Sequence, residues 1–174
     1  MPTTVREATE LDAEAIARVH TLSWQSAYRG LVPDSYLDGL KWERRYEQWA
    51  RLLPDRPTAH SSVFVAVDSQ DVVVGFSSMG PVREKGLEPT GLFEIYAIYV
   101  LPGMWGRAFG HRLLEASLAA LPQGVPGVTL WVLSGNARGR RFYERAGFGP
   151  DGATKLADIA GEELPELRYR LDLS

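Results

Sequence analysis

The sequence predicts a single mixed α/β (α+β) domain, with a mostly antiparallel sheet, one parallel pair of strands at its centre and helices on both faces. A chain of 174 residues is long enough for one hydrophobic core and short for two, so residues 1–174 are expected to form one domain. Hydrophobic periods alternate in the order β-α-α-β-β-β-α-β-α-β-β. The succession of strand, helix and strand between Leu92 and Leu133 implies a parallel crossover.

The N-terminal part combines a short strand with two helical patterns. Apolar residues spaced three to four apart follow Thr9, which is a suitable N-cap, and aromatic and turn residues separate the two patterns. The expected elements are a strand at Val5–Ala8, a helix at Leu11–His20, a break marked by Trp24, Tyr28, Gly30 and Pro33, and a helix from about Asp34 to Leu53.

Three β-branched or aromatic runs then predict strands that neighbour one another. The first two flank Asp68–Asp71, a connection typical of a hairpin. The expected strands are Val63–Val67, Val72–Met79 and Leu92–Val100.

The C-terminal half alternates between helix and strand. Leucines share one face of the first helix, and Gly147 is a suitable left-handed end for the second. The expected elements are a helix at Gly106–Leu121, a buried strand at Val128–Leu133, a helix at Ala137–Ala146, and strands near Gly152–Asp158 and Leu167–Asp172.

Composition excludes several functional classes. A formal net charge of -3 indicates no overall basic surface for nucleic acid. The chain has no cysteine, which excludes disulfides, thiolate catalysis and cysteine-ligated metals, and its three histidines show no helical metal-binding pair. No apolar run approaches the roughly 18 residues of a membrane span. We therefore expect a cytoplasmic protein without metal, membrane or nucleic-acid partners.

One turn is suited to binding a phosphate. A buried strand ending near Val100 passes through Pro102, Gly103 and Gly106 into a helix that contains Gly110. A helix start offers unpaired N–H groups and the positive end of the macrodipole, and glycines let an anion approach closely. The same pattern also occurs in α/β proteins that bind nothing. Two rival phosphate motifs, Gly-x-x-x-x-Gly-Lys-Ser/Thr and Gly-x-Gly-x-x-Gly, do not match this turn.

Several motifs together resemble those of the GNAT N-acetyltransferase superfamily. They are Val100-Leu101-Pro102, the turn Gly106–Gly110 before Leu113-Leu114, Asn136-Ala137 and the run Phe142–Phe148. The predicted order of elements is similar to the whole fold of that family. The resemblance implies a sheet whose central parallel strands splay apart, and acetyl-CoA as the cosubstrate.

In that family the turn has the pattern Gln/Arg-x-x-Gly-x-Gly/Ala, and its backbone N–H groups bind the pyrophosphate of coenzyme A. This sequence departs from the pattern, because Trp105 stands where Gln or Arg is usual and Ala108 replaces the first glycine. With a right-handed helical backbone, Ala108 would still present its N–H, so we expect binding to persist. The resemblance assigns this role to Trp105, Gly106, Arg107, Ala108, Phe109, Gly110 and His111.

The pantetheine arm is expected between the two splayed strands, Leu92–Val100 and Val128–Leu133. A strand edge can pair with this peptide-like arm as with another strand. The resemblance therefore assigns the main chain of Ile98 and Val100, and the side chain of Asn136, to coenzyme binding; Asn136 is equally suited to capping its helix. Six arginines could either contact the coenzyme phosphates or form a solvated basic face, and both interpretations remain open. They are Arg107, Arg112, Arg138, Arg140, Arg141 and Arg145.

Two residues are candidates for proton transfer. Tyr143 matches the family tyrosine whose hydroxyl lies near the coenzyme sulfur and acts as the general acid, and a phenol with a pKa of about 10 keeps its proton at neutral pH. Its alternative role is a core aromatic. Glu94 is the candidate base that accepts the proton of the amine, and its alternatives are a solvated residue at a strand start or replacement by a water chain.

The acceptor site is predicted from aromatic residues. By resemblance Trp24 and Tyr28 line the acceptor side, where they could pack against a cationic amine, with Glu94 as the counter-charge and Tyr96 on the same strand face. Packing between two helices is the competing interpretation for the aromatics. A further aromatic set is either core or the surface of a homodimer: Trp42, Tyr46 and Trp49.

We therefore expect an acetyl-CoA-dependent N-acetyltransferase that transfers the acetyl group directly to a primary amine, since no cysteine is present to carry it. The acceptor is a small-molecule amine, a protein N-terminus or a lysine. The alternative function is a non-catalytic acyl-CoA-binding regulatory domain.

Overall fold

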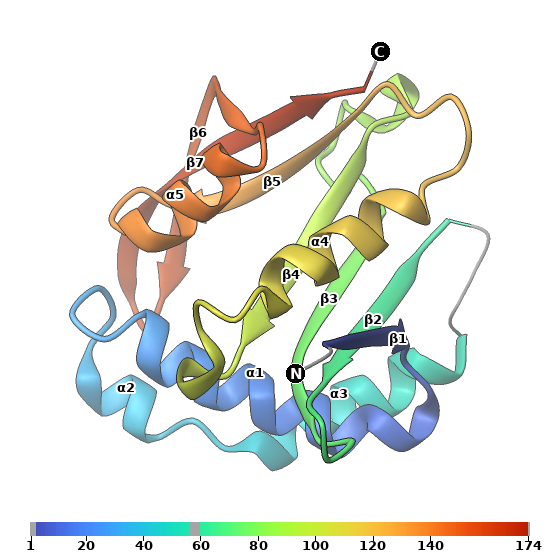
Figure 1. The fold of residues 1–174 in the computed structure, drawn as a ribbon. Helices are drawn as coiled ribbons and strands as arrows, with labels where there is room; N and C mark the ends of the chain where they lie inside the picture. The colour runs from blue at the N-terminus through green and yellow to red at the C-terminus, as the bar shows by residue number, and fades with distance from the viewer. Residues whose placement is uncertain (1–2, 56–59, 174) are drawn as a thin grey trace.

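The computed structural model describes residues 3–55 and 60–173, which form a seven-stranded sheet with helices on both faces (Figure 1). The strands are β1 (Thr4–Glu7), β2 (Ser62–Val67), β3 (Val73–Pro81), β4 (Phe93–Val100), β5 (Gly127–Leu133), β6 (Gly149–Ile159) and β7 (Glu162–Asp172). The α-helices are α1 (Ala13–Ala27), α2 (Asp34–Asp38), α3 (Trp42–Leu52), α4 (Phe109–Ala119) and α5 (Ala137–Arg145). Short 3-10 turns lie at Glu10–Asp12, Leu53–Asp55, Glu88–Thr90 and Pro102–Met104.

The strand order is β1-β2-β3-β4-β5-β7-β6, and every neighbouring pair is antiparallel except β4 and β5. This confirms the predicted mixed sheet with a central parallel pair. The parallel pairing is short, because it joins only Phe93 to Val128 and Glu94 to Thr129. Beyond these residues β4 and β5 diverge (Figure 1). The cleft described below is lined by residues of both strands.

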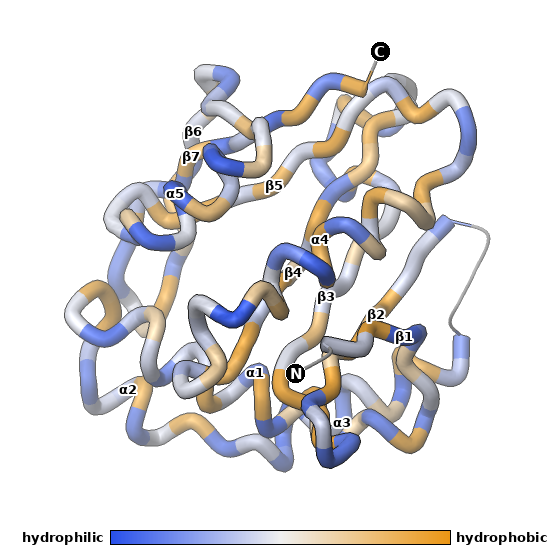
Figure 2. The backbone as a smooth tube through the Cα atoms, viewed as in Figure 1, coloured by the Kyte–Doolittle hydropathy of each residue, from blue (hydrophilic) through white to orange (hydrophobic). Residues whose placement is uncertain are grey.

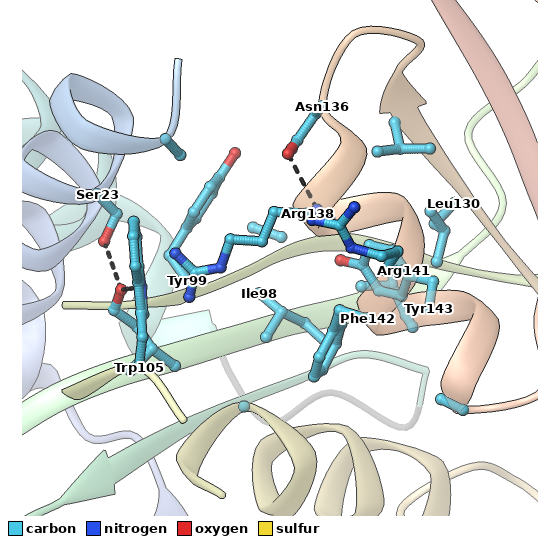
Figure 3. A pocket seen from close by; sticks show the side chains of 18 of the residues that line it. Ser23, Ile98, Tyr99, Trp105, Leu130, Asn136, Arg138, Arg141, Phe142 and Tyr143 are labelled. Carbon is cyan, nitrogen blue, oxygen red and sulfur yellow. Dashed lines mark hydrogen bonds between the residues drawn. The ribbon is translucent and has the colours of Figure 1, made fainter. Parts of the chain in front are cut away.

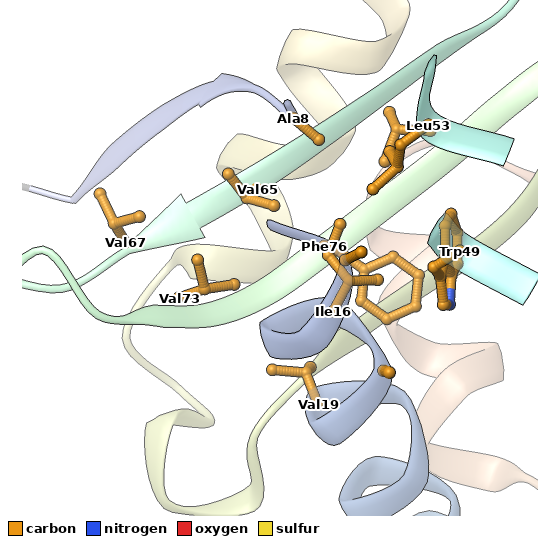
Figure 4. Packing of buried hydrophobic residues seen from close by; sticks show 12 residues of the cluster. Ala8, Ile16, Val19, Trp49, Leu53, Val65, Val67, Val73 and Phe76 are labelled. Atoms are coloured by element: carbon orange, nitrogen blue, oxygen red, sulfur yellow. The ribbon is translucent and has the colours of Figure 1, made fainter. Parts of the chain in front are cut away.

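Alternating side chains of the strands supply two core layers. On one face, Val65 and Phe76 pack against Ile16 of α1 and Trp49 of α3 (Figure 4). On the other face, Leu113 and Leu114 of α4 pack on the sheet, and α5 covers β5. In Figure 2 the tube is largely white to orange along the central strands, whose residues are mostly buried. Trp49 is 9% exposed, so it belongs to the core rather than to a dimer surface.

Helix α1 is longer than the sequence predicts. Instead of ending at His20, it runs to Ala27 and contains Trp24, so the expected break begins only at Tyr28. Two polar residues on its buried face explain the error. Thr21 Oγ1 donates to the carbonyl of Ala17 at 3.0 Å, and Ser23 Oγ donates to the carbonyl of Val100 at 3.4 Å. These hydrogen bonds allow hydroxyl groups to occupy buried positions of the helix. The regular spacing of apolar residues therefore ends before the helix does.

The predicted helix from Asp34 to Leu53 is two helices. Helix α2 ends at Asp38, and α3 starts at Trp42. Gly39 caps α2, since its N–H donates to the carbonyls of Ser35 and Tyr36 at 3.2 Å each. The last two strands are also longer than expected, because β6 begins at Gly149 and β7 at Glu162. The extension of β7 places Glu166 in the sheet, which matters for the site.

Candidate active site

A cleft of about 920 Å³ opens where β4 and β5 diverge (Figure 3). Residues from β4, the turn before α4, the start of α4, β5 and α5 line it, and α1 and β7 contribute at one end. The volume lies within the range of about 300–1,000 Å³ typical of small-molecule sites. Most of the predicted coenzyme residues line this cleft: Ile98, Val100, Trp105, Gly106, Ala108, Phe109, Gly110, His111, Asn136 and Tyr143. Arg107 does not line it.

The turn before α4 exposes backbone N–H groups to the cleft. The first N–H that bonds within the helix is that of Arg112, which donates to the carbonyl of Ala108 at 3.0 Å. The N–H groups of Phe109, Gly110 and His111 therefore have no partner inside the helix, and all three residues line the cleft. This arrangement is suited to binding an anion.

Ala108 does not have the right-handed backbone expected from the sequence. Its φ is 67° and its ψ is 0°, the left-handed conformation that favours glycine, and Gly106 has a φ of 75°. The expectation failed because the chain must reverse sharply between the end of β4 and the start of α4. The alanine at this position therefore carries backbone strain that a glycine would not.

Trp105 and Arg138 meet at the cleft. The indole Nε1 of Trp105 donates to the carbonyl of Val100 at 2.8 Å, and the guanidinium carbon of Arg138 lies 3.0 Å from the centroid of the indole ring (Figure 3). Partial burial lowers the pKa of Arg138. Because Trp105 and Ser23 both donate to the Val100 carbonyl, that oxygen is engaged by the protein itself.

Helix α5 places Tyr143 in the cleft. Asn136 caps the helix, since its Oδ1 accepts from the N–H of Gly139 at 3.0 Å, and it lines the cleft as well. The Tyr143 ring packs edge-on against Phe142 and Phe148, at centroid distances of 5.1 and 5.8 Å. Burial raises the pKa of the Tyr143 hydroxyl well above its usual value, and Tyr99 acts in the same direction. The hydroxyl is therefore protonated at neutral pH.

Glu94 is buried but does not line the cleft. It is 5% exposed, and its Oε2 accepts from Nη2 and Nε of Arg83 at 3.0 and 3.2 Å. Tyr96 lines the cleft, its hydroxyl donates to the carbonyl of Pro81, and Arg83 lies 3.8 Å over its ring. Glu94 and Tyr96 thus meet at Arg83, and the base role of Glu94 stays a prediction.

The end of the cleft next to α1 is aromatic. Tyr28 lines it, whereas Trp24 lies behind and packs edge-on against Tyr28 at 4.7 Å. The hydroxyls of Tyr28 and Tyr99 are 2.9 Å apart and share a hydrogen bond. Burial raises the pKa of both phenols, so both are neutral at pH 7.

Sequence reasoning missed three residues that line this end. Tyr99 belongs to a strand that was recognised, whereas Ser23 lies beyond His20, where the first helix was expected to end. The packing of α1 against β4 brings both residues to the cleft. Glu166 lay outside the predicted last strand, which was expected to begin at Leu167. Its only signal was the alternation of polar and apolar residues just before that strand.

The described residues show neither a metal cluster nor a membrane-spanning helix. Residues 3–55 and 60–173 contain no group of three or more His, Asp or Glu side chains placed to hold a metal ion. None of their helices has the length and apolar character needed to cross a membrane.

Comparison with known proteins points to one family. The family model described as "Acetyltransferase (GNAT) family" matches residues 16–148. The uncharacterized N-acetyltransferase YuaI of Bacillus subtilis is 33% identical over 166 residues, which cover 94% of this chain and 90% of that protein. The spermidine N(1)-acetyltransferase of Thermoplasma acidophilum is 24% identical over 170 residues, 95% of this chain and 96% of that protein.

Solved structures share the fold. The PaiA N-acetyltransferase of Thermoplasma acidophilum, in complex with coenzyme A, superposes with a TM-score of 0.74 at 19% identity and covers 99% of this chain and 100% of its own. YncA of Salmonella typhimurium, with its cofactor acetyl-CoA, has a TM-score of 0.69 at 21% identity and covers 100% of this chain and 95% of its own.

Proposed function

Since the chain belongs to the acetyltransferase (GNAT) family, we propose that it transfers the acetyl group of acetyl-CoA directly to the amino group of a small-molecule amine. One observation carries the proposal: a single cleft holds the free N–H groups at the start of α4 and the protonated hydroxyl of Tyr143. The first feature suits a pyrophosphate and the second suits a leaving thiolate. The names of the relatives favour an enzyme over a non-catalytic acyl-CoA-binding domain.

The coenzyme is proposed to lie along the cleft from α4 to Tyr143. The N–H groups of Phe109, Gly110 and His111 bind the pyrophosphate, with Arg138, Arg141 and Arg145 of α5 as the cations that line the same cleft. Beyond Glu94, β4 has no strand partner on its β5 side, so the amides of the pantetheine arm are proposed to pair with its main chain around Ile98. The Val100 carbonyl is already engaged by Ser23 and Trp105.

The chemistry requires one bond to form and one to break. The amine nitrogen attacks the thioester carbonyl carbon, the carbon–sulfur bond breaks, and the Tyr143 hydroxyl gives its proton to the sulfur. The attacking nitrogen must also lose a proton. We propose Glu94 as the acceptor of that proton, reached through water because its carboxylate is held by Arg83 outside the cleft lining.

Direct transfer is supported by the side chains that could otherwise act as a nucleophile. The chain has no cysteine, and the Ser23 hydroxyl in the cleft donates to a backbone carbonyl rather than to a base. Initial rates measured at several concentrations of both substrates should therefore give intersecting double-reciprocal lines. Parallel lines, the pattern of an acetyl-enzyme intermediate, would exclude direct transfer.

The proposed acceptor is a small amine rather than a protein. One relative is named for spermidine, and Tyr28, Tyr99 and Ser23 line the cleft on the side of α1. The test is to incubate the enzyme with acetyl-CoA and a panel of amines and to detect acetylated products by mass spectrometry. Small amines should be acetylated and peptide N-termini should not; the reverse result would overturn the choice of acceptor.

A further inference from the structure

Charged side chains of both signs line the cleft. The arginines Arg138, Arg141 and Arg145 belong to α5, whereas Glu166 of β7 is the only carboxylate among the described residues that line the cleft. Glu166 pairs in register with Leu133 of β5 and Lys155 of β6. Tyr28 and Tyr99 line the same cleft.

The charge of Glu166 is only weakly compensated. Its side chain is 18% exposed, and its ion-pair partner is Lys155, whose Nζ lies 3.6 Å from Oε2 and whose side chain is 49% exposed. The same ammonium lies 4.2 Å from the ring centroid of Trp131. A half-exposed lysine pair contributes little free energy and exchanges readily with another cation. The cleft therefore has a carboxylate that an incoming cation can use.

Glu166 shares the cleft with the phenol pair Tyr28–Tyr99, whose hydroxyls are 2.9 Å apart. Burial is the main cause of the raised pKa of both phenols, and the negative charge of Glu166 adds to it in each case. One carboxylate and two neutral hydroxyls therefore line the same cleft.

We propose that Glu166, with the hydroxyl oxygens of Tyr28 and Tyr99, binds a second positive charge of the acceptor, which makes the preferred substrate a diamine or polyamine. The inference rests on the proposed function. The nitrogen that attacks must be neutral, whereas a second ammonium keeps its charge and needs an acceptor-rich site. A carboxylate and two neutral phenol oxygens supply one in the same cleft as Tyr143.

The test compares 1,4-diaminobutane with butylamine, which has the same carbon chain and one amino group. In the enzyme saturated with coenzyme A, Glu166→Gln should weaken the binding of 1,4-diaminobutane about tenfold in titration calorimetry, as loss of one charge-assisted bond predicts. Glu163→Gln is the matched control, because it removes the same charge from the exposed part of the same strand. Lys155→Gln should tighten binding roughly threefold, since it removes the competing cation.

Turnover gives a second readout. The ratio of kcat/KM for 1,4-diaminobutane to that for butylamine should be about tenfold or more in the wild type and near one in Glu166→Gln. Unchanged diamine binding in Glu166→Gln, or equal effects of Glu166→Gln and Glu163→Gln, would overturn the inference. Acetylation of both amines without a preference would support the proposed function and refute the diamine site. Glu166-dependent binding of the diamine without any acetylation would support the diamine site and refute the proposed function.

Discussion

The guanidinium carbon of Arg138 lies 3.0 Å from the centroid of the Trp105 indole ring, so α5 and the turn before α4 meet across the proposed coenzyme site. The indole is itself held by the carbonyl of Val100. The aromatic residue at this position therefore orients a cation toward the cleft. A glutamine or arginine here could not form the same ring contact.

Replacing Arg138 should weaken coenzyme binding. Arg138→Met is expected to raise the Kd for acetyl-CoA about tenfold, because a partly buried guanidinium forms strong charge-assisted bonds with phosphate. Titration calorimetry at low and high salt measures the effect, which should shrink as salt rises. Arg44→Met, on an exposed part of α3, is the control. Equal affinities of the two variants would refute a phosphate contact by Arg138.

The strained backbone at Ala108 predicts a stabilising substitution. Ala108→Gly should raise the free energy of unfolding by about 1 kcal/mol, because glycine adopts a positive φ without steric cost. In the middle of α4, Ala116→Gly should lower it by about 1 kcal/mol. Thermal melts report both changes as opposite shifts in Tm of about 2–4 °C. A loss of stability in Ala108→Gly would contradict the left-handed conformation.

His20 should make the fold sensitive to acid. Burial lowers the pKa of His20 to about 3 from 6.5, and the guanidinium of Arg45, whose Nη1 lies 2.8 Å from Nε2, acts in the same direction. Between these values the unfolded chain binds a proton that the folded protein does not. Stability should therefore fall as pH decreases below 6.5, by at most about 1.4 kcal/mol per unit from this group.

Denaturant unfolding at several pH values tests this dependence. His20→Asn should show a shallower loss of stability as the pH falls from about 6 to about 4, as linkage predicts for one titrating group. Identical slopes in the wild type and His20→Asn would mean that His20 is not held neutral by the fold.

The pair Glu94–Arg83 should be energetically coupled. In a double-mutant cycle with Glu94→Gln and Arg83→Gln we expect a coupling of about 1 kcal/mol, modest because the Arg83 side chain is 65% exposed. Additive effects of the two substitutions on the free energy of unfolding would refute the interaction between Glu94 and Arg83.

If Glu94 also accepts the proton of the amine, Glu94→Gln should lower the rate of acetylation most at low pH, where less amine is neutral. A uniform loss of rate at every pH would exclude that role.

Local patterns predicted most of the fold. The strands around Phe93–Val100 and Gly127–Leu133 and the helix after Asn136 were recognisable because each repeats its apolar residues with one period. The family resemblance in the turn before α4 also predicted coenzyme-binding residues, most of which line the cleft. These features depend on a few neighbouring residues, so a single sequence reveals them.

Tertiary contacts decided the rest. Helix α1 continues past His20 because Thr21 and Ser23 find backbone partners, one of them in β4. Strand β7 begins at Glu162 rather than at the expected Leu167, although it contains Pro165, which cannot donate to a sheet. The register of β7 with β5 and β6 is what turns Glu166 toward the cleft, and no local pattern specifies that register.

The most direct test of the proposed mechanism measures the release of free thiol from acetyl-CoA in the presence of a diamine, for the wild type and for Tyr143→Phe. Phenylalanine keeps the packing against Phe142 and Phe148 and removes only the hydroxyl. We predict amine-dependent thiol release by the wild type and a fall in kcat of about 100-fold or more in the variant, with the affinity for acetyl-CoA unchanged. Equal kcat values for the two proteins would contradict the role of Tyr143 as the general acid.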